Sequence, residues 1–487
     1  MSDTAGGGGY GAQMRVPLRL APLAVFLVLV VPLVAICAWR VPAGQVPDEP
    51  THVMRAASLL HGAIIGHRVA TLNVETGSRD AGVTGNTGLA LAAIAGNGDM
   101  APLPPEASRA ARLAWVWDIP WQPRLSFVSS ANTAAYAPVT YIPAALGLGA
   151  AILMGAKPHA AIIGARLANV LAFTLIGALA LLMAARGRLL LLITLSLPMT
   201  IWLAGSVSQD GLAIAVTVLG AALLTRGSRA GFWCGCAALA VLVLQKPPFL
   251  PLAILPLVVP GTSGPGSWRR RIGGAVSVAL PGLLWALAVA ALVSVPLLPG
   301  PPYHPGPLWP GDPARLFRSA IAGAQIAVVM HHPVQVALLP FTSGGAALPS
   351  LWLQFIGVLG QLSIRLPRAL YTLWSLAIVS GLGALTASPR PPGTRWFTGP
   401  AAAVAVVASV ELIFLALYLT WTPVGMDRVD GIQGRYFLPL LPLILFVVPA
   451  SGVSRRLPGW LWWPAPIAAI LATDATLPGV IAAHFYR

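Results

Sequence analysis

Apolar residues in this chain are grouped into long runs, and most polar residues are confined to the segments between the runs. Residues 20–39, 272–296 and 399–419 are three such runs, and each reaches the roughly 20 residues that a helix needs to cross a bilayer. Runs of this length predict membrane spans rather than core helices of a soluble protein. The pattern therefore predicts an all-α, polytopic membrane protein.

Basic residues between the runs set the predicted topology. We take Arg15 and Arg19 as cytoplasmic, and the positive-inside rule then requires the short basic loops to be cytoplasmic as well. All of these loops meet that requirement if residues 136–154 form an interfacial helix and not a span. Residues 248–261 are short and broken by prolines, so a kinked or re-entrant segment is the alternative there. The predicted spans, about eleven in number, are residues 17–38, 161–183, 188–205, 210–226, 230–246, 248–261, 272–297, 366–387, 398–420, 435–451 and 459–482.

This topology divides the chain into a disordered cytoplasmic N-terminus, residues 1–16, and one transmembrane domain, residues 17–487. Within the domain, residues 39–160 are expected to form a large first external loop with interfacial helices, and residues 298–365 a second long external segment. The first apolar run is long and no small-x-small cleavage site follows it, so it is predicted to be an uncleaved helix. We therefore expect a multi-pass protein of the cell (inner or plasma) membrane with its N-terminus in the cytoplasm.

The composition supports the membrane class and argues against several others. Hydrophobic residues make up 57% of the chain and charged residues 9%, against roughly 25% charged in a soluble domain. The formal net charge of +16 is explained by the basic loops, so no nucleic-acid partner is expected. Cys37, Cys234 and Cys236 lie in apolar runs, which disfavours a disulfide framework or a zinc site. The chain also lacks the Walker A, His-Glu-x-x-His and Gly-x-Ser-x-Gly motifs of ATPases, zinc proteases and serine hydrolases.

The acidic residues indicate where chemistry would take place. Most of the fourteen fall on the predicted outer side, and only Asp3 is cytoplasmic. Glu411 and Asp474 lie within predicted spans, where a carboxylate is a functional candidate unless it is neutral or paired inside the bundle. Any chemistry is therefore expected to face outward.

An acidic turn directly after the first span is the most informative motif. In Val46-Pro-Asp-Glu-Pro-Thr-His52, the carboxylates of Asp48 and Glu49 are held between prolines at the membrane surface. Partial desolvation there raises a carboxyl pKa toward the range of a catalytic base. If a helix begins at Pro50, His52 and Arg55 share one of its faces. The alternative interpretation is a capped helix start with no catalytic role.

A second polar segment joins two predicted spans on the outer side. It contains Arg428, Gln433, Arg435 and Tyr436. The two guanidinium groups are suited to hold a phosphate or pyrophosphate through paired hydrogen bonds. Alternatively, Arg435 and Tyr436 are ordinary interfacial anchors.

Two further residues lie at predicted outer helix ends. Lys246 precedes two prolines and has no acidic neighbour in the sequence, which suits an anionic lipid head group. Simple snorkelling of the long side chain is the alternative. Asp210 opens a helix, where a plain capping role is the simpler interpretation.

Taken in order, these motifs resemble a bacterial family of predicted membrane proteins of unknown function that is grouped with the GT-C glycosyltransferase superfamily. The resemblance covers residues 47–439, which is most of the chain. Its matching elements are Pro47-Asp48-Glu49-Pro50-x-His52, Asn132-x-x-x-Tyr136-x-Pro138-x-x-Tyr141, Arg166-x-x-Asn169, Ser206-x-Ser208-x-Asp210, Lys246-Pro247-Pro248 and Gln433-Gly434-Arg435-Tyr436.

The resemblance implies an outward-facing enzyme that transfers a sugar from a polyprenyl-phosphate donor to an envelope glycan or lipid acceptor. Asp48 would be the general base and Glu49 the second candidate, while Asp210 would orient a hydroxyl. Lys246, Arg428 and Arg435 would neutralise the leaving phosphate. A divalent cation, Mg or Mn, would have Asp48, Glu49 and Asp210 as possible ligands. The remaining expected substrate-binding residues are His52, Arg55, Tyr136, Gln433 and Tyr436.

Two other functions remain open at this point, namely a lipid-linked glycan transporter or flippase and a non-catalytic component of an envelope polysaccharide assembly complex. A transferase needs a carboxylate in an outer cavity beside basic groups. A flippase needs a polar path through the centre of the bilayer, for which Glu411 is a candidate.

Overall fold

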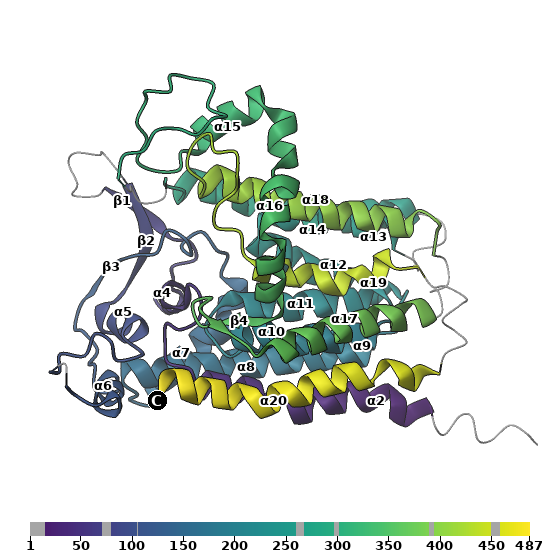
Figure 1. Cartoon of the computed structure of the whole chain (residues 1–487), viewed down its shortest axis with the longest axis horizontal. Coiled ribbons are helices and arrows are strands. Elements are labelled where there is room, and N and C mark those ends of the chain that lie inside the picture. Colours follow the sequence, from purple (N-terminus) through teal and green to yellow (C-terminus); the bar gives the residue numbers. More distant parts are fainter. Residues whose placement is uncertain are drawn as a thin grey trace, which may run out of the picture.

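The computed structural model describes residues 15–70, 79–104, 106–259, 267–296, 301–388, 394–449 and 458–487. The predicted disordered tail, residues 1–16, lies outside the described residues except for its last two positions. The described chain is mostly helical, and most of its long helices lie side by side along one direction (Figure 1). The predicted all-α membrane architecture is therefore correct in its main feature.

Seven helices in the described part are long and apolar enough to cross a membrane. The first consists of α2 (Arg15–Val25), the π-helical turn η1 (Phe26–Val30) and α3 (Val31–Arg40). The others are α8 (Pro158–Met183), α14 (Ser267–Leu292), α16 (Pro333–Gly357), α17 (Arg368–Ala387), α18 (Thr398–Thr420) and α20 (Pro464–Phe485), which follows the turn η6 (Gly459–Trp462). All except α16 coincide with predicted spans.

The remaining predicted spans are shorter or broken helices. The predicted span 188–205 is interrupted at Pro198. A proline has no N–H to donate to the helical hydrogen bonds, and it restricts the backbone conformation of the residue before it. Helices α10 and α11 meet at a bend of 117° and become an eighth candidate span if they count as one. The exact number of eleven spans therefore stays a prediction. The shorter or broken helices in place of these spans are α9 (Arg188–Ser196), α10 (Pro198–Ala204), α11 (Gln209–Leu224), α12 (Arg229–Gln245), η3 (Pro247–Ile254), α13 (Leu255–Val258), η4 (Gly434–Leu443) and α19 (Ile444–Val447).

Helix α16 was not predicted, because Pro340 and Pro349 interrupt its apolar sequence. It nevertheless continues through both prolines and packs against α17, α18 and η4. In Figure 1 it runs across the long helices and not along them. It follows α15 (Ala322–His331) and leads into a small hairpin of β4 (Val358–Leu359) and β5 (Ile364–Arg365). The external location of residues 298–365 stays a prediction.

The first loop forms a compact unit at one end of the helices, on the left in Figure 1. Contrary to the prediction of helices and loops alone, it contains a three-stranded antiparallel sheet of β1 (His67–Ala70), β2 (Arg79–Asn86) and β3 (Leu125–Ser129), in which Gly82 pairs with both His67 and Ser129. The helices of this unit are α4 (Glu49–Leu59), α5 (Thr87–Ile94), α6 (Arg109–Val116), η2 (Val139–Tyr141) and α7 (Ile142–Leu153). Together η2 and α7 are shorter than the roughly 20 residues of a span, and their position at a membrane surface stays a prediction.

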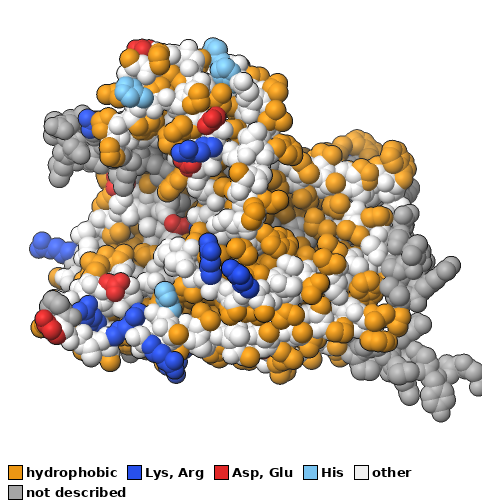
Figure 2. All heavy atoms as spheres, viewed as in Figure 1, with side chains coloured by type: hydrophobic (Ala, Val, Ile, Leu, Met, Phe, Trp, Pro, Cys, Tyr) orange, Lys and Arg blue, Asp and Glu red, His pale blue; other side chains and the backbone are white. Residues whose placement is uncertain are grey.

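The outer surface of the long helices is apolar over most of the visible face (Figure 2). Charged side chains gather toward the left of that face, over the first-loop unit and around α16. A broad apolar band beside a charged end is the arrangement expected of helices that sit in lipid. The structure is thus that of a multi-pass membrane protein with a polar unit at one end.

Candidate active site

Asp48 occupies a turn that directs its carboxylate away from the helix it precedes. Its backbone is left-handed, with φ of 61°, a conformation that aspartate tolerates better than most residues. The carboxylate makes no capping bond to α4. Instead Oδ1 accepts from Nδ2 of Asn132 at 3.1 Å, and Oδ2 accepts from the guanidinium of Arg435 at 2.8 Å. The simple capping alternative is therefore wrong for this residue.

Glu49 has a different environment, although it is the next residue along the chain. Its carboxylate is fully buried and forms a bidentate pair with Arg166 of α8, with N···O distances of 2.7 and 2.6 Å. The same carboxylate accepts from the backbone N–H groups of Gly44 and Val207 at 3.0 and 3.1 Å. Four donors thus occupy its two oxygens, which is how a buried charge is satisfied. Glu49 ties the acidic turn to α8 and to the α10–α11 bend.

Asp210 lies immediately beyond that bend. The helix cap there is Ser208, whose hydroxyl accepts from the N–H of Asp210 at 3.3 Å. The Asp210 carboxylate is therefore free to form ion pairs with Lys246 at 2.6 Å and with Arg435 at 3.4 Å. Asn169 of α8 fixes the bend from below by donating to the carbonyl of Ser206 at 2.9 Å. The capping interpretation is wrong for Asp210 as well.

Four charged side chains from distant parts of the sequence consequently form one network. Arg435 bridges Asp48 and Asp210, and Lys246 completes the chain of alternating charges. The ring of Tyr436 lies 5.4 Å from the Lys246 ammonium and 5.3 Å from the Arg435 guanidinium, within cation–π range. Gln433 accepts from Nε of Arg435 at 2.6 Å. The network is formally neutral.

A histidine packs beneath the acidic turn. His52 is buried, its Nδ1 lies 2.6 Å from the hydroxyl of Tyr141, and its ring stacks on Tyr136. Burial lowers the pKa of His52 from 6.5 to about 4, although the carboxylates of Asp210 and Asp48 oppose this effect. His52 is therefore neutral at physiological pH and supports the wall of the site.

This pKa predicts an acid-sensitive fold. The folded-state pKa lies below the unfolded value, so the stability contribution of neutral His52 is complete above about pH 6.5 and is lost as the pH falls toward about 4. At about 1.4 kcal/mol per pKa unit, the loss is about 3 kcal/mol at most. Melting temperatures of the purified protein between pH 7 and 4 should fall less steeply in His52→Asn than in the wild type. The same substitution at the exposed His61 should leave the slope unchanged, and equal slopes for all three proteins would contradict the prediction.

A cavity of about 650 Å³ opens beside this network. Asp48 lines it, with a side chain that is 44% exposed, whereas the side chain of Arg435 is 2% exposed and lies behind the wall. Its wall combines polar side chains with mostly apolar residues from the ends of α14 and α18 and from residues 320–323. The polar lining residues include Asp48, Asn132, Thr133, Tyr136, Ser294, Thr420, Gln433 and Tyr436, and the apolar ones include Val289, Val293, Val295, Ile321 and Leu417.

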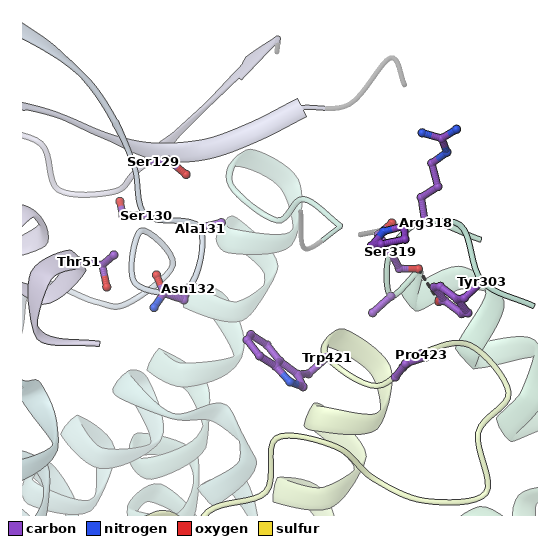
Figure 3. Close-up of a pocket in the computed structure, with 12 residues that line it drawn as sticks. Thr51, Ser129, Ser130, Ala131, Asn132, Tyr303, Arg318, Ser319, Trp421 and Pro423 are labelled. Atoms are coloured by element: carbon purple, nitrogen blue, oxygen red, sulfur yellow. Dashed lines mark hydrogen bonds between the residues drawn. The ribbon is translucent and has the colours of Figure 1, made fainter. Parts of the chain in front are cut away.

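A second cavity, of about 570 Å³, adjoins the first. The two share Ala131, Asn132, Ala320 and Trp421 in their walls. Figure 3 shows Thr51, Ser129, Ser130 and Asn132 on one side of the second cavity, Tyr303, Arg318 and Ser319 on the other, and Trp421 between them. The site thus offers two adjoining chambers, each with polar and apolar side chains in its walls, and Asn132 lies at their boundary.

Two of the predicted site residues lie outside this arrangement. Arg428 is largely exposed and pairs with its neighbour Asp430 at 3.2 Å. Arg55 is buried and donates to backbone carbonyls, including that of Tyr136 at 3.0 Å, and to the hydroxyl of Ser58. Its guanidinium therefore holds the end of α4 in place and does not reach the cavities. Tyr136, Gln433 and Tyr436 line the larger cavity, and their role in substrate binding stays a prediction.

Some residues of the site were not among the predicted site residues. Asn132 and Arg166 belong to the motifs that carry the family resemblance, so the sequence contained a signal for both. Arg318 and Trp421 lie outside every motif, and only the folded chain brings them to the cavity.

The carboxylates do not fit a metal ion as they are placed. Glu49 is paired with Arg166, Asp210 with Lys246, and Asp48 with Arg435. Across the residues that the structure describes, no group of three histidine, cysteine, aspartate or glutamate side chains could hold an ion. A divalent cation stays a prediction from the family resemblance.

The chain matches one protein family over most of its length. The model of the family described as "Predicted membrane protein (DUF2142)" matches residues 31–444. No curated protein matches the chain. Among solved structures, it is similar to the crystal structure of ArnT from Cupriavidus metallidurans bound to undecaprenyl phosphate, with 15% sequence identity and a TM-score of 0.39. The similarity covers 97% of this chain and 66% of that one, so this chain spans just under two thirds of the length of ArnT.

Proposed function

The chain belongs to this family of predicted membrane proteins, and from that premise we propose that it is an inverting membrane glycosyltransferase of the GT-C type. It transfers a sugar from a polyprenyl-phosphate donor to an envelope glycan or lipid acceptor on the outer side of the membrane, with its N-terminus in the cytoplasm. The motif resemblance supplies the class of donor. The observation that carries the proposal is the position of Asp48, a half-exposed carboxylate in a cavity wall that pairs with the buried Arg435 and is linked through Asp210 to the mostly buried Lys246.

The larger cavity suits the donor. A polyprenyl-phosphate sugar needs an apolar surface for its isoprene units and polar groups for its phosphate and sugar. The ends of α14 and α18 supply the first, while Asn132, Gln433 and Tyr436 supply hydrogen-bonding groups beside Asp48. Since α14 and α18 are candidate spans, a lipid chain would lie against them without leaving the hydrocarbon region.

In the proposed reaction, Asp48 accepts the proton of an acceptor hydroxyl while the hydroxyl oxygen attacks the anomeric carbon of the donor sugar. The bond between the anomeric carbon and the phosphate oxygen breaks, and its electron pair leaves with the polyprenyl phosphate. The products are the glycosylated acceptor, with inverted anomeric configuration, and polyprenyl phosphate. The hydrogen bond from Asn132 orients the carboxylate of Asp48 toward the boundary of the two cavities.

The charge network favours this step. It is neutral before reaction, with two carboxylates and two cations. When Asp48 takes the proton, the network becomes positive by one unit at the moment when the leaving phosphate gains negative charge. Arg435 and Lys246 are already paired and are covered by Tyr436, so we assign them this electrostatic role in place of direct phosphate binding. Glu49 is assigned a positioning role, because its oxygens are occupied.

The proposal is tested with the purified full-length protein in proteoliposomes. A panel of radiolabelled polyprenyl-phosphate sugars is added together with envelope lipids and glycans as a pool of acceptors. The expected result is radiolabel in an acceptor and an equal amount of released polyprenyl phosphate. Movement of intact labelled donor between leaflets, with no bond cleavage for any donor, would overturn the proposal in favour of the flippase alternative.

A further inference from the structure

The second cavity contains the cationic side chain of Arg318, which has no ion-pair partner among the described residues. Arg318 is exposed at its rim, and no described carboxylate lies within ion-pair distance of it. This differs from the network behind the first cavity, where Arg435 and Lys246 are both paired with carboxylates. An unpaired guanidinium at a cavity rim is a site for a planar or tetrahedral anion.

Arg318 is held on a braced segment. The adjacent Phe317 is buried and pairs through its backbone with Tyr303, with N···O distances of 2.9 and 2.8 Å. The hydroxyl of Tyr303 donates to the carbonyl of Ser319 at 2.9 Å and accepts from the N–H of Val424 at 3.0 Å. These bonds tie both sides of Arg318 to the segment that follows α18, so its backbone is positioned before any ligand binds.

Trp421 gives the same cavity an aromatic surface. Its side chain is 51% exposed and lines both cavities. Gly431 lies against the edge of the indole, and a side chain added there would approach it to 2.6 Å, so the ring is confined on that side. A flat, exposed indole in a cavity whose walls also contain hydroxyl-bearing side chains suits a pyranose ring, which presents C–H bonds on its faces and hydroxyls at its edge.

The positions of these groups set the orientation of a ligand. Figure 3 places Asn132 and Arg318 on opposite sides of Trp421, with the exposed Arg318 side chain extending away from the indole. Asn132 also donates to Asp48, so it marks the end of the cavity nearest the proposed base. A saccharide stacked on Trp421 would present a hydroxyl toward Asp48 and any anionic substituent toward Arg318.

We infer that the second cavity binds a saccharide carrying a carboxylate or a phosphate, with Arg318 holding the anion and Trp421 the sugar ring. This inference deepens the proposed function and rests on it for the statement that the bound saccharide is the acceptor. Arg318 then selects the acceptor without taking part in proton transfer.

Equilibrium binding to the purified full-length protein tests the inference, because it requires neither donor nor turnover. Two matched pairs of probes are titrated by calorimetry: trigalacturonate with its methyl ester, and trehalose 6-phosphate with trehalose. At least one anionic probe is expected to bind about tenfold more tightly than its neutral partner, as a charge-assisted hydrogen bond requires. The preferred pair identifies the anion as a carboxylate or a phosphate.

The variants separate the two contacts. Arg318→Gln should abolish the preference for the anionic probe and leave the affinity for the neutral probe unchanged. Arg318→Lys should keep most of the preference for the anionic probe. Trp421→Ala should lower the affinity for both the anionic and the neutral probe of a pair. Arg315→Gln is the matched control, since this arginine packs over Phe317 at 4.7 Å and does not line the cavity. Equal affinities within both pairs, or an anion preference that survives in Arg318→Gln, would overturn the inference. Selective binding without transfer from any donor would overturn the proposed function alone.

Discussion

Replacing Asp48 with asparagine is expected to lower the rate of sugar transfer by about 10²- to 10⁴-fold, which is the usual contribution of a general base. Asparagine is the cleanest substitution at this position, because it tolerates the left-handed backbone of Asp48 and its oxygen still accepts a hydrogen bond from Arg435. The variant should therefore fold and bind donor normally. Initial rates of transfer, measured at saturating donor, give the comparison.

The control for this experiment is Asp118→Asn, which makes the same change at an exposed carboxylate paired with Lys157. Its transfer rate and melting temperature should match those of the wild type, since exposed ion pairs contribute about 1 kcal/mol or less. A rate for Asp48→Asn within about threefold of the wild type would remove Asp48 as the base. Loss of donor binding in that variant would assign Asp48 to recognition instead.

The second large effect is expected at Glu49, and it should appear first as a loss of stability. Glu49→Gln leaves the buried guanidinium of Arg166 without a counterion, a change that costs roughly 3–5 kcal/mol in other buried pairs. It also removes the tie between the acidic turn and the α10–α11 bend, so Asp48 and Asp210 are no longer held together. A marked fall in melting temperature and a loss of transfer are both predicted.

A double variant distinguishes pairing from mere disruption of the fold. Glu49→Gln combined with Arg166→Gln contains no uncompensated buried charge, so it should recover part of the melting temperature that the single variant loses. Transfer should recover less than stability, because the amide pair cannot reproduce the hydrogen bonds that Arg166 makes to the carbonyls of Ala38 and Pro42. A single variant as stable as the wild type would contradict the assigned role of Glu49.

Part of this site could be predicted from the sequence, because its motifs are local and their residue types are specific. The acidic turn and the segment around Arg435 each contain ionisable groups beside an apolar run, and both were expected on the outer side. Contact between Asp48 and Arg435 joins residues 387 positions apart. Only the shared topology of the spans, inferred from loop charges, suggested that they would meet.

The different roles of Asp48 and Glu49 could not be predicted. They are adjacent carboxylates in one turn, and their separation depends on a single backbone torsion, the positive φ of Asp48. That torsion directs Asp48 into the cavity, while Glu49, the first residue of α4, is buried against Arg166. Neither the composition nor the hydrophobic pattern of the sequence predicts the φ angle of a single residue such as Asp48.

The sheet and α16 escaped prediction for a different reason. Strand β2 contains Gly82 and Gly85 and lacks the alternation of a half-buried strand, so its pairing depends on tertiary contacts. Helix α16 contains two prolines that normally interrupt a helix. Arg318 precedes α15 in a segment with no motif, and only the fold brings it to the same cavity as Trp421.

The anomeric configuration of the product tests the central proposal most directly. With a donor of known configuration, the glycosidic bond formed by the wild-type protein is assigned by nuclear magnetic resonance, and released polyprenyl phosphate is quantified in the same reaction. A single displacement assisted by Asp48 predicts complete inversion, with one polyprenyl phosphate released for each sugar transferred. Retained configuration would require a double displacement or attack on the same face as the leaving phosphate, and it would contradict the role proposed for Asp48.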